Sequence, residues 1–240
     1  MSGHSKWATT KRAKAVVDAK RGTVFTKLSN VITIAARKGG DPTMNFALAQ
    51  AIDQARAVNM PKDNIERAIK RGTGEGAGQQ IEELVYEGHG PVQSQFIVRV
   101  LTDSRNRAAS NIRHLFTKSG GSLGAVLWNF DHKGVILISE ENWEASKNSW
   151  DDFVLESIDN GADDIIHEKN GVIIYTKPED LMKAKHWLES KKINTESAAM
   201  EYVAKEKLVL NDNDKAKIEA FIEALDDDED VSDYFTNVEM

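Results

Sequence analysis

The feature that most constrains the fold is a turn signal, Asn170-Gly171, in the middle of alternating strand and helix patterns. Asparagine followed by glycine favours a type I′ turn, and so predicts a β-hairpin between residues 164–168 and 172–176. The other expected elements of this run are, in chain order, a strand at 135–139, a helix at 150–160, a helix at 179–190 and a strand at 198–203. That order predicts a ferredoxin-like α+β unit.

A second α+β unit is expected on both sides of this run. Its expected elements are a strand at 96–101, a helix at 105–119 and a strand at 125–130, then a strand at 207–210, a helix at 213–225 and a strand at 231–237. The chain order therefore indicates a discontinuous α+β domain, 81–131 and 205–240, interrupted by an inserted ferredoxin-like domain at 132–204. The acidic run 226–230 lacks the ligand spacing of a calcium loop, and we interpret it as a solvated loop.

The first third of the chain has helical periodicity. Apolar residues recur at three- and four-residue spacing over 23–38, and Gly39-Gly40 ends this pattern. Asp41-Pro42 is typical of an N-cap followed by proline at the first helical position, so a second helix is expected to begin there. A third helix is expected from Pro61 to a stop at Gly72. These patterns divide the region into a basic arm (1–21), a helical bundle (22–72) and a Gly-rich linker (73–80).

The whole chain is thus expected to be an α+β protein with an N-terminal three-helix bundle and two ferredoxin-like α+β domains, one inserted in the other. Hydrophobic residues make up 40% of the sequence, which suits a globular protein. There is no cysteine, which excludes disulfides and thiolate chemistry. No apolar run is long enough to span a bilayer, and no secretory signal is recognisable, so we expect a cytoplasmic protein without membrane contact.

Charge is distributed very unevenly along the chain. Residues 1–80 contain 14 Lys/Arg against six Asp/Glu, whereas residues 81–240 contain 17 against 32. The overall net charge of −7 therefore combines a basic first third with an acidic body. Such asymmetry is typical of a nucleic-acid-binding segment attached to a globular domain.

The candidate binding residues are the cations of this basic third and one aromatic residue. The predicted nucleic-acid-binding set is Lys6, Trp7, Lys11, Arg12, Lys14, Lys20, Arg21, Lys27, Arg37, Lys38, Lys62, Arg67, Lys70 and Arg71. The cations suit phosphate oxygens, and Trp7 suits stacking on a base. A secondary basic patch is expected at Arg105, Arg107 and Arg113. No row of Asn or Gln marks a base-reading helix, which favours recognition of backbone or shape.

No catalytic constellation is recognisable. The six histidines are isolated from one another, so they do not have the spacing of a helical metal site. We therefore expect no enzyme activity, metal, cofactor or small-molecule substrate, and we expect a monomer.

Several motifs resemble those of one known family. They are SGHSKW at residues 2–7, DAKRG at 18–22, NMPKDNIERAIKRG at 59–72, YEGHGP at 86–91 and LTDSRNR at 101–107. By these motifs the chain resembles the YebC family, which includes the mitochondrial translational activator of cytochrome oxidase. The resemblance covers the whole chain and is densest over residues 2–130. The second helix departs from the family pattern, because Phe46, Ala47 and Ala49 stand where the family often has Pro and Arg.

The resemblance implies a three-domain fold and a nucleic-acid partner, with no catalytic residues. Family members are described as DNA-binding transcriptional regulators. Others are described as translation factors that act on ribosomal RNA and ease stalls at proline-rich stretches. Both interpretations stay open for this sequence, DNA being the leading one. A protein-interaction scaffold is a third hypothesis, and an enzyme that uses carboxylates is a weaker fourth.

Overall fold

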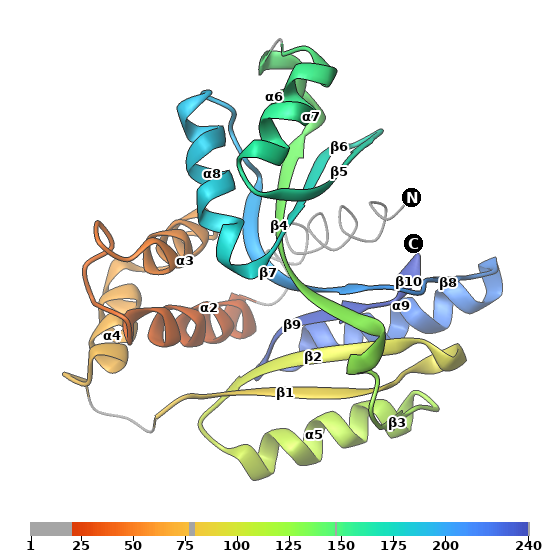
Figure 1. Ribbon diagram of the computed structural model, residues 1–240. Helices are drawn as coiled ribbons and strands as arrows, with labels where there is room; N and C mark the ends of the chain where they lie inside the picture. The colour runs from red at the N-terminus through yellow and green to blue at the C-terminus, as the bar shows by residue number, and fades with distance from the viewer. Residues whose placement is uncertain (1–20, 77–79, 147, 240) are drawn as a thin grey trace. The chain divides into compact units, whose positions relative to one another are not determined.

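The computed structural model describes residues 21–76, 80–146 and 148–239 of the 240-residue chain. These residues form two compact units. We call residues 21–126 with 210–236 the outer unit, and residues 127–209 with 237–239 the inserted unit. Both units contain helices and antiparallel sheets, and the first elements of the described residues are helices (Figure 1). The predicted α+β class is therefore confirmed.

The outer unit starts with a bundle of three helices. They are α2 (Arg21–Ala36), α3 (Phe46–Ala57) and α4 (Lys62–Thr73). Their core includes Ile32 and Leu48, which are fully buried. A Cβ atom at Gly72 would lie 2.3 Å from the carbonyl oxygen of Thr33, so only glycine allows α2 and α4 to pack this closely. Gly72 lies inside α4, so the predicted stop at Gly72 is wrong; Gly74, with φ of +84°, caps the helix.

The start of the second helix differs from the prediction. Asn45 is the N-cap of α3, because its side-chain oxygen accepts a hydrogen bond from the Leu48 N–H at 3.2 Å. The Asp41 carboxylate instead accepts from the backbone N–H of Thr43 at 2.9 Å and from its hydroxyl at 2.7 Å. This local turn holds Asp41-Pro42 outside the helix, so the predicted cap at Asp41 is wrong.

The sheet of the outer unit has the strand order β3-β1-β2-β9. The strands are β1 (Glu82–His89), β2 (Gln95–Thr102), β3 (Ser122–Leu123) and β9 (Val231–Thr236), and the helices are α5 (Arg105–Lys118) and α9 (Asp212–Asp227), with the short turn η2 (Pro91–Gln93). Phe96 of β2 and Phe116 of α5 each contact Phe221 of α9 edge to face, with ring centroids 4.9 and 5.0 Å apart. These three rings join the sheet to both helices.

In this region one strand was not predicted, and two predicted strands differ from the structure. β1 was not predicted, because most of its side chains are exposed or half-exposed and its apolar alternation is weak. The predicted strand at 125–130 is wrong: residues 127–129 form a 3-10 turn, η3 (Leu127–Asn129), and Phe130 begins a strand of the inserted unit. The predicted strand at 207–210 is reduced to β8 (Leu208–Val209), which pairs in parallel with β10 (Val238–Glu239).

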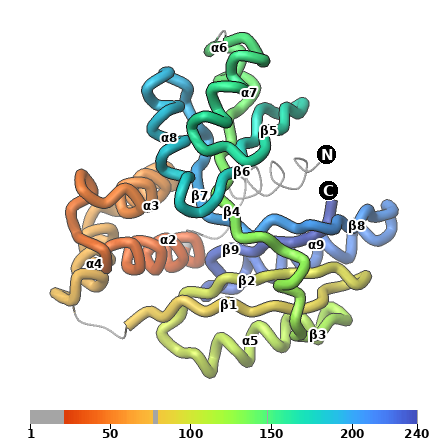
Figure 2. Tube along the Cα trace, viewed as in Figure 1, coloured from red at the N-terminus to blue at the C-terminus, as the bar shows by residue number. Residues whose placement is uncertain are grey.

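The inserted unit has the predicted strand and helix order. Its elements are β4 (Phe130–Ser139), α6 (Glu140–Ser146), α7 (Trp150–Asp159), β5 (Ala162–Glu168), β6 (Gly171–Thr176), η4 (Pro178–Asp180), α8 (Leu181–Ser190) and β7 (Ser197–Ala204). The sheet order β5-β6-β4-β7, with every neighbouring pair antiparallel, is that of a ferredoxin-like unit (Figure 2). Only the short helix α6 was not predicted.

In both hairpins the backbone conformation of the turn differs from what the local sequence predicts. Glu168 pairs with Gly171, so the β5–β6 turn consists of Lys169 and Asn170, and neither has a positive φ. The predicted type I′ turn at Asn170-Gly171 is therefore wrong, although the hairpin is confirmed. In the β1–β2 hairpin, by contrast, Val92 and Gln93 both have φ of +59°, without any glycine to favour it.

Among the described helices, none combines the length and the apolar composition that crossing a bilayer would require.

Candidate nucleic-acid interface

The predicted binding residues are spread over several parts of the chain. Lys6, Trp7, Lys11, Arg12, Lys14 and Lys20 lie outside the described residues. Arg21 is the first residue of α2. Of the others, Lys27 lies on α2, Arg37 and Lys38 follow it, and Lys62, Arg67, Lys70 and Arg71 lie on α4. The secondary patch, Arg105, Arg107 and Arg113, lies on α5.

The cation on α2 points into the outer unit. The Lys27 ammonium donates to the carbonyl oxygen of Asp226, in the last turn of α9, at 2.7 Å. Helix C-terminal carbonyls carry partial negative charge, which favours a cation in this position. Burial lowers the pKa of Lys27 below its ordinary value, while neighbouring carboxylates, Asp226 first among them, oppose the shift. Lys27 therefore joins the bundle to the α+β part of the unit.

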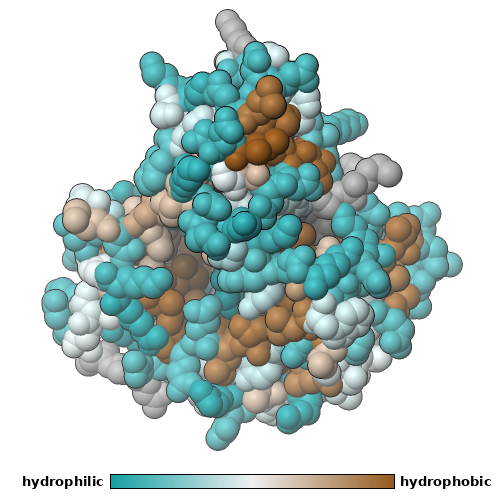
Figure 3. Space-filling view, viewed as in Figure 1, coloured by the Kyte–Doolittle hydropathy of each residue, from teal (hydrophilic) through white to brown (hydrophobic). Residues whose placement is uncertain are grey.

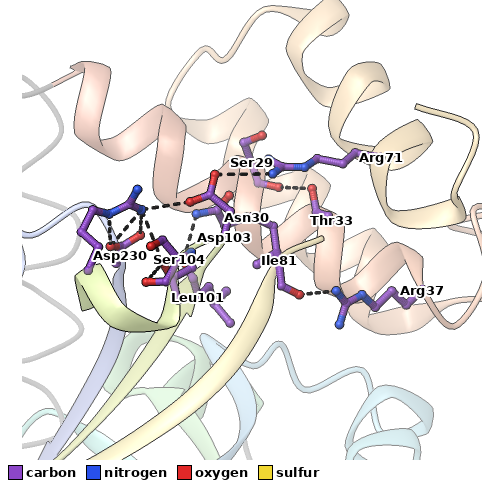
Figure 4. A network of polar contacts seen from close by, with 12 residues as sticks. Ser29, Asn30, Thr33, Arg37, Arg71, Ile81, Leu101, Asp103, Ser104 and Asp230 are labelled. Carbon is purple, nitrogen blue, oxygen red and sulfur yellow. Dashed lines mark hydrogen bonds and ion pairs between the residues drawn. The ribbon is translucent and has the colours of Figure 1, made fainter. Parts of the chain in front are cut away.

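Two further predicted cations have intramolecular partners. The Arg37 guanidinium donates to the carbonyl oxygen of Ile81, just before β1 (Figure 4). The Arg71 guanidinium lies 3.9 Å from the Asp103 carboxylate and is only 25% exposed. Between these contacts the buried Asn30 donates to the Leu101 carbonyl oxygen at 3.1 Å. We call these contacts of Lys27, Asn30, Arg37 and Arg71 the docking network.

The outer face of α4 has a different environment. Ile65 and Ala68 are buried in the bundle, whereas Lys62, Arg67 and Lys70 are exposed on the other side of the helix. We call these three residues the α4 cations. Lys62 lies 3.4 Å from Glu66, and Arg67 donates to the carbonyl oxygen of Asp63 at 3.2 Å, so both charges stay at the surface. An exposed ion pair such as Lys62–Glu66 is weak and leaves the cation available to a phosphate.

A shallow groove borders Lys70 but is poorly suited to phosphate. It is lined by Gly40, Asp41, Pro42, Glu66, Ile69, Lys70, Thr73 and Glu75. Three carboxylates thus face one ammonium, and hydrogen bonds from Thr43 hold the pKa of Asp41 below its ordinary value. A phosphate would be repelled from this groove, so the outer face of α4 is the better candidate.

The predicted secondary patch on α5 is largely engaged. Arg105 lies 2.8 Å from the Glu82 carboxylate. Arg107 binds Asp230 with nitrogen–oxygen distances of 2.9 and 3.2 Å, and these hydrogen bonds raise the pKa of Arg107. Arg113 is exposed and has no side-chain partner within the described ranges.

The acidic run at 226–230 was misjudged from the sequence. Asp230 is 4% exposed, its carboxylate binds Arg107, and its carbonyl oxygen accepts from the Leu101 N–H at 2.8 Å. Asp226 belongs to α9 and receives Lys27. The interpretation as a solvated loop is therefore wrong at these positions. The signal in the sequence for the docking network was Asn30, a polar residue among the apolar residues of α2. A buried amide needs a hydrogen-bond partner, which predicts a contact with another element.

The described part of the chain shows no cluster of three or more His, Asp or Glu that could hold a metal ion. His167 lies 3.0 Å from Glu140, and His186 lies 3.2 Å from Glu189, so each histidine faces one carboxylate. Such pairs are ordinary surface contacts.

Comparison with known proteins gives one consistent family. Residues 5–75 match the family model described as the TACO1/YebC protein N-terminal domain, and residues 81–238 match that of the TACO1/YebC second and third domain. A probable transcriptional regulatory protein of Desulforamulus reducens is 44% identical, covering 100% of this chain and 99% of its own. One of Enterococcus faecalis is 43% identical with the same coverage. The crystal structure of a conserved hypothetical protein from Aquifex aeolicus is similar, with a TM-score of 0.77 at 38% identity over 94% of this chain and 93% of that one.

Proposed function

The chain belongs to the TACO1/YebC family, and from this premise we propose that it is a non-enzymatic regulatory protein that binds nucleic acid through its basic first third. The observation that carries the proposal is the charge distribution: residues 1–80 contain eight more Lys/Arg than Asp/Glu, whereas the rest of the chain is acidic. Because the body repels polyanions, contact is directed to one part of the molecule.

Three of the predicted binding residues have intramolecular partners, which supports a smaller binding set. Lys27 and Arg71 are half-buried against the α+β part of the outer unit, so they are poorly placed to meet a ligand. Arg37 is exposed, but its guanidinium donates to the Ile81 carbonyl oxygen of the same part. We therefore assign phosphate contact to the α4 cations and the exposed Lys38, together with the basic residues of the arm. Lys and Arg at a protein surface position a phosphate backbone without reading its sequence.

Duplex DNA is the leading partner, because the relatives from Desulforamulus reducens and Enterococcus faecalis are named probable transcriptional regulatory proteins. Structured ribosomal RNA is the second candidate. One observation favours it: Asn64, the only Asn or Gln within α4, accepts a hydrogen bond from Arg67 and is not free to read a base edge. Recognition by backbone and shape suits a folded RNA at least as well as a promoter.

The test combines binding with crosslinking. Binding to a DNA duplex and to a structured RNA is measured by fluorescence anisotropy, with Lys62→Ala, Arg67→Ala and Lys70→Ala combined in one variant. The matched control removes three exposed lysines of the inserted unit, Lys169, Lys177 and Lys183. We expect the α4 variant to bind more weakly and the control to bind as the wild type does, or more weakly only to a small extent. Equal loss in both variants would contradict the proposed site.

Crosslinking in cells, followed by parallel sequencing of attached DNA and RNA, decides between the two partners. Discrete promoter fragments would support a transcriptional regulator. Enrichment of ribosomal RNA would support a translation factor. If neither nucleic acid were enriched above a sample that was not crosslinked, nucleic-acid binding as the protein's function would be refuted.

A further inference from the structure

The inserted unit carries an apolar pair on the solvent side of α7. Leu155 is 66% exposed and Ile158 is 56% exposed. Residues three apart are neighbours on one helix face, so these two side chains are adjacent. Phe153 and Ser157, on the opposite face, are buried in the core. Figure 3 shows hydrophobic side chains gathered over the region where α7 lies in Figure 1. The fold of the unit needs only the inner apolar face of this helix, so the outer pair calls for another explanation.

The helix that carries this pair is firmly anchored. Trp143 contacts Phe153 with ring centroids 4.7 Å apart and Trp150 with centroids 5.6 Å apart, both edge to face. Phe153 also contacts Trp187 of α8 at 5.4 Å. Aromatic contacts of this kind fix α7 against α6 and α8. Leu155 and Ile158 are therefore presented on a rigid frame, which reduces the entropy lost when a partner binds.

The surroundings of the pair are strongly acidic. Asp151 and Asp159 lie four residues before and after Leu155, so each is one helical turn away on the same face. Residues 140–164 contain nine Asp/Glu and a single basic residue, Lys147. Two lysines approach this segment from α8 and its C-cap: Lys183 donates to the Asp159 carbonyl oxygen at 2.9 Å, and Lys191 lies 2.5 Å from the Glu156 carboxylate. The carboxylates of Asp151, Asp152 and Asp159 have no side-chain partner among the residues the structure describes. Such a surface repels nucleic acid and a second copy of itself, and it attracts a cationic partner.

We propose that the α7 face, Leu155 and Ile158 framed by Asp151 and Asp159, is a docking surface for a basic protein segment that presents an apolar ridge. The apolar pair supplies contact area at the centre of the surface, and the carboxylates supply charge complementarity at its rim. This activity is separate from nucleic-acid binding, because it uses another unit and the opposite charge. It gives the protein a means of bringing a protein partner to a nucleic acid.

The probe is a synthetic amphipathic Lys/Leu peptide of about 18 residues, with leucines at helical spacing. Its control is a peptide of identical composition in which the leucines are scrambled. Binding to the full chain is measured by calorimetry. The test variant combines Leu155→Gln and Ile158→Gln. Glutamine is polar, so it is suited to an exposed position, and it has a high helix propensity, so α7 is preserved. The matched control combines Met44→Gln and Val209→Gln, which removes two apolar side chains that are 88% and 74% exposed elsewhere.

We expect the ordered peptide to bind the wild type, and the α7 variant to bind it about 10- to 100-fold more weakly. The control variant should bind as the wild type does. A variant with Asp151→Asn and Asp159→Asn should bind more weakly at low salt and show less salt dependence. The proposal is overturned if the scrambled peptide binds equally well, or if the α7 variant binds unchanged. It is also overturned if sedimentation shows a wild-type dimer that the α7 variant abolishes, because a second copy would then occupy the face.

Discussion

Helices α2 and α4 are neighbours in one bundle, yet most of their cations have different surroundings. Lys27 of α2 and Arg37 just after it donate to carbonyl oxygens of Asp226 and Ile81. The three α4 cations remain on the surface. The sequence assigns all of these residues to one basic region, but only the second group is placed to meet a polyanion. A count of charges therefore overstates the binding surface.

The difference follows from what each helix packs against. α2 lies between the other two bundle helices, α3 and α4, and the α+β part of the outer unit, where carbonyl oxygens of Asp226 and Ile81 accept hydrogen bonds from Lys27 and Arg37. α4 packs mainly on α2 through a narrow apolar face. Of the cations on α4, Arg71 meets the Asp103 carboxylate, whereas Lys62, Arg67 and Lys70 lie on the solvent side of the helix and stay exposed.

The largest expected effect on stability comes from removing the buried Asp230 carboxylate. Asp230→Ala would leave Arg107 with Asp103 as its remaining acidic partner and would remove the carboxylate beside the Leu101 contact. We expect a loss of about 2 to 3 kcal/mol in the free energy of unfolding, because a buried hydrogen-bonded carboxylate is lost. Urea denaturation followed by circular dichroism measures it. Asp227→Ala, in the same acidic run, is the control; a similar loss there would remove the special role of Asp230.

The next effect separates the two helices directly. Loss of the three α4 cations should reduce the slope of log K against log salt by about 2 to 3 for duplex DNA, because each phosphate contact contributes about 0.9. Lys27→Met combined with Arg37→Met also removes two cations, but should leave the slope nearly unchanged. Anisotropy titrations between low and moderate salt measure both. A comparable change in the two variants would erase the distinction between α2 and α4.

A smaller effect is expected from the neutral member of the docking network. Asn30→Ala leaves the Leu101 carbonyl oxygen without its side-chain donor in a buried position. We expect the free energy of unfolding to fall by about 1 to 2 kcal/mol, with nucleic-acid affinity unchanged in the folded protein. Gln54→Ala, at an exposed position of α3, controls for the loss of an amide elsewhere in the bundle. An unchanged stability for Asn30→Ala would show that the network contributes nothing to docking.

The smallest effect is a pH dependence at Lys27. Its pKa is lowered in the folded state from an ordinary value of 10.5, so the unfolded chain binds more protons in the window just below that value. Stability therefore rises with pH through this window. The free energy of unfolding of the wild type, relative to Lys27→Met, should increase as pH is raised from neutral toward 10.5. Lys27→Arg, which stays protonated, should show no such increase; a flat difference for the wild type would argue that Lys27 is fully solvated.

Local patterns were sufficient for much of this fold. The bundle helices and the strand and helix order of the inserted unit follow from spacing of apolar residues, which depends on neighbours a few positions away. The uneven distribution of charge is likewise a property of the sequence alone. Those features determined the α+β class, the position of the β5–β6 hairpin and the general location of the basic region.

The tertiary structure decided the features that depend on distant partners. β1 exists because β2 and β3 pair with it, and Val92 and Gln93 adopt positive φ because the hairpin between those strands requires a left-handed turn. Tertiary contacts also determine which cations have partners on distant segments and which stay exposed. Lys27 meets an acceptor 199 positions away along the chain, and no pattern of neighbouring residues encodes a contact of that range.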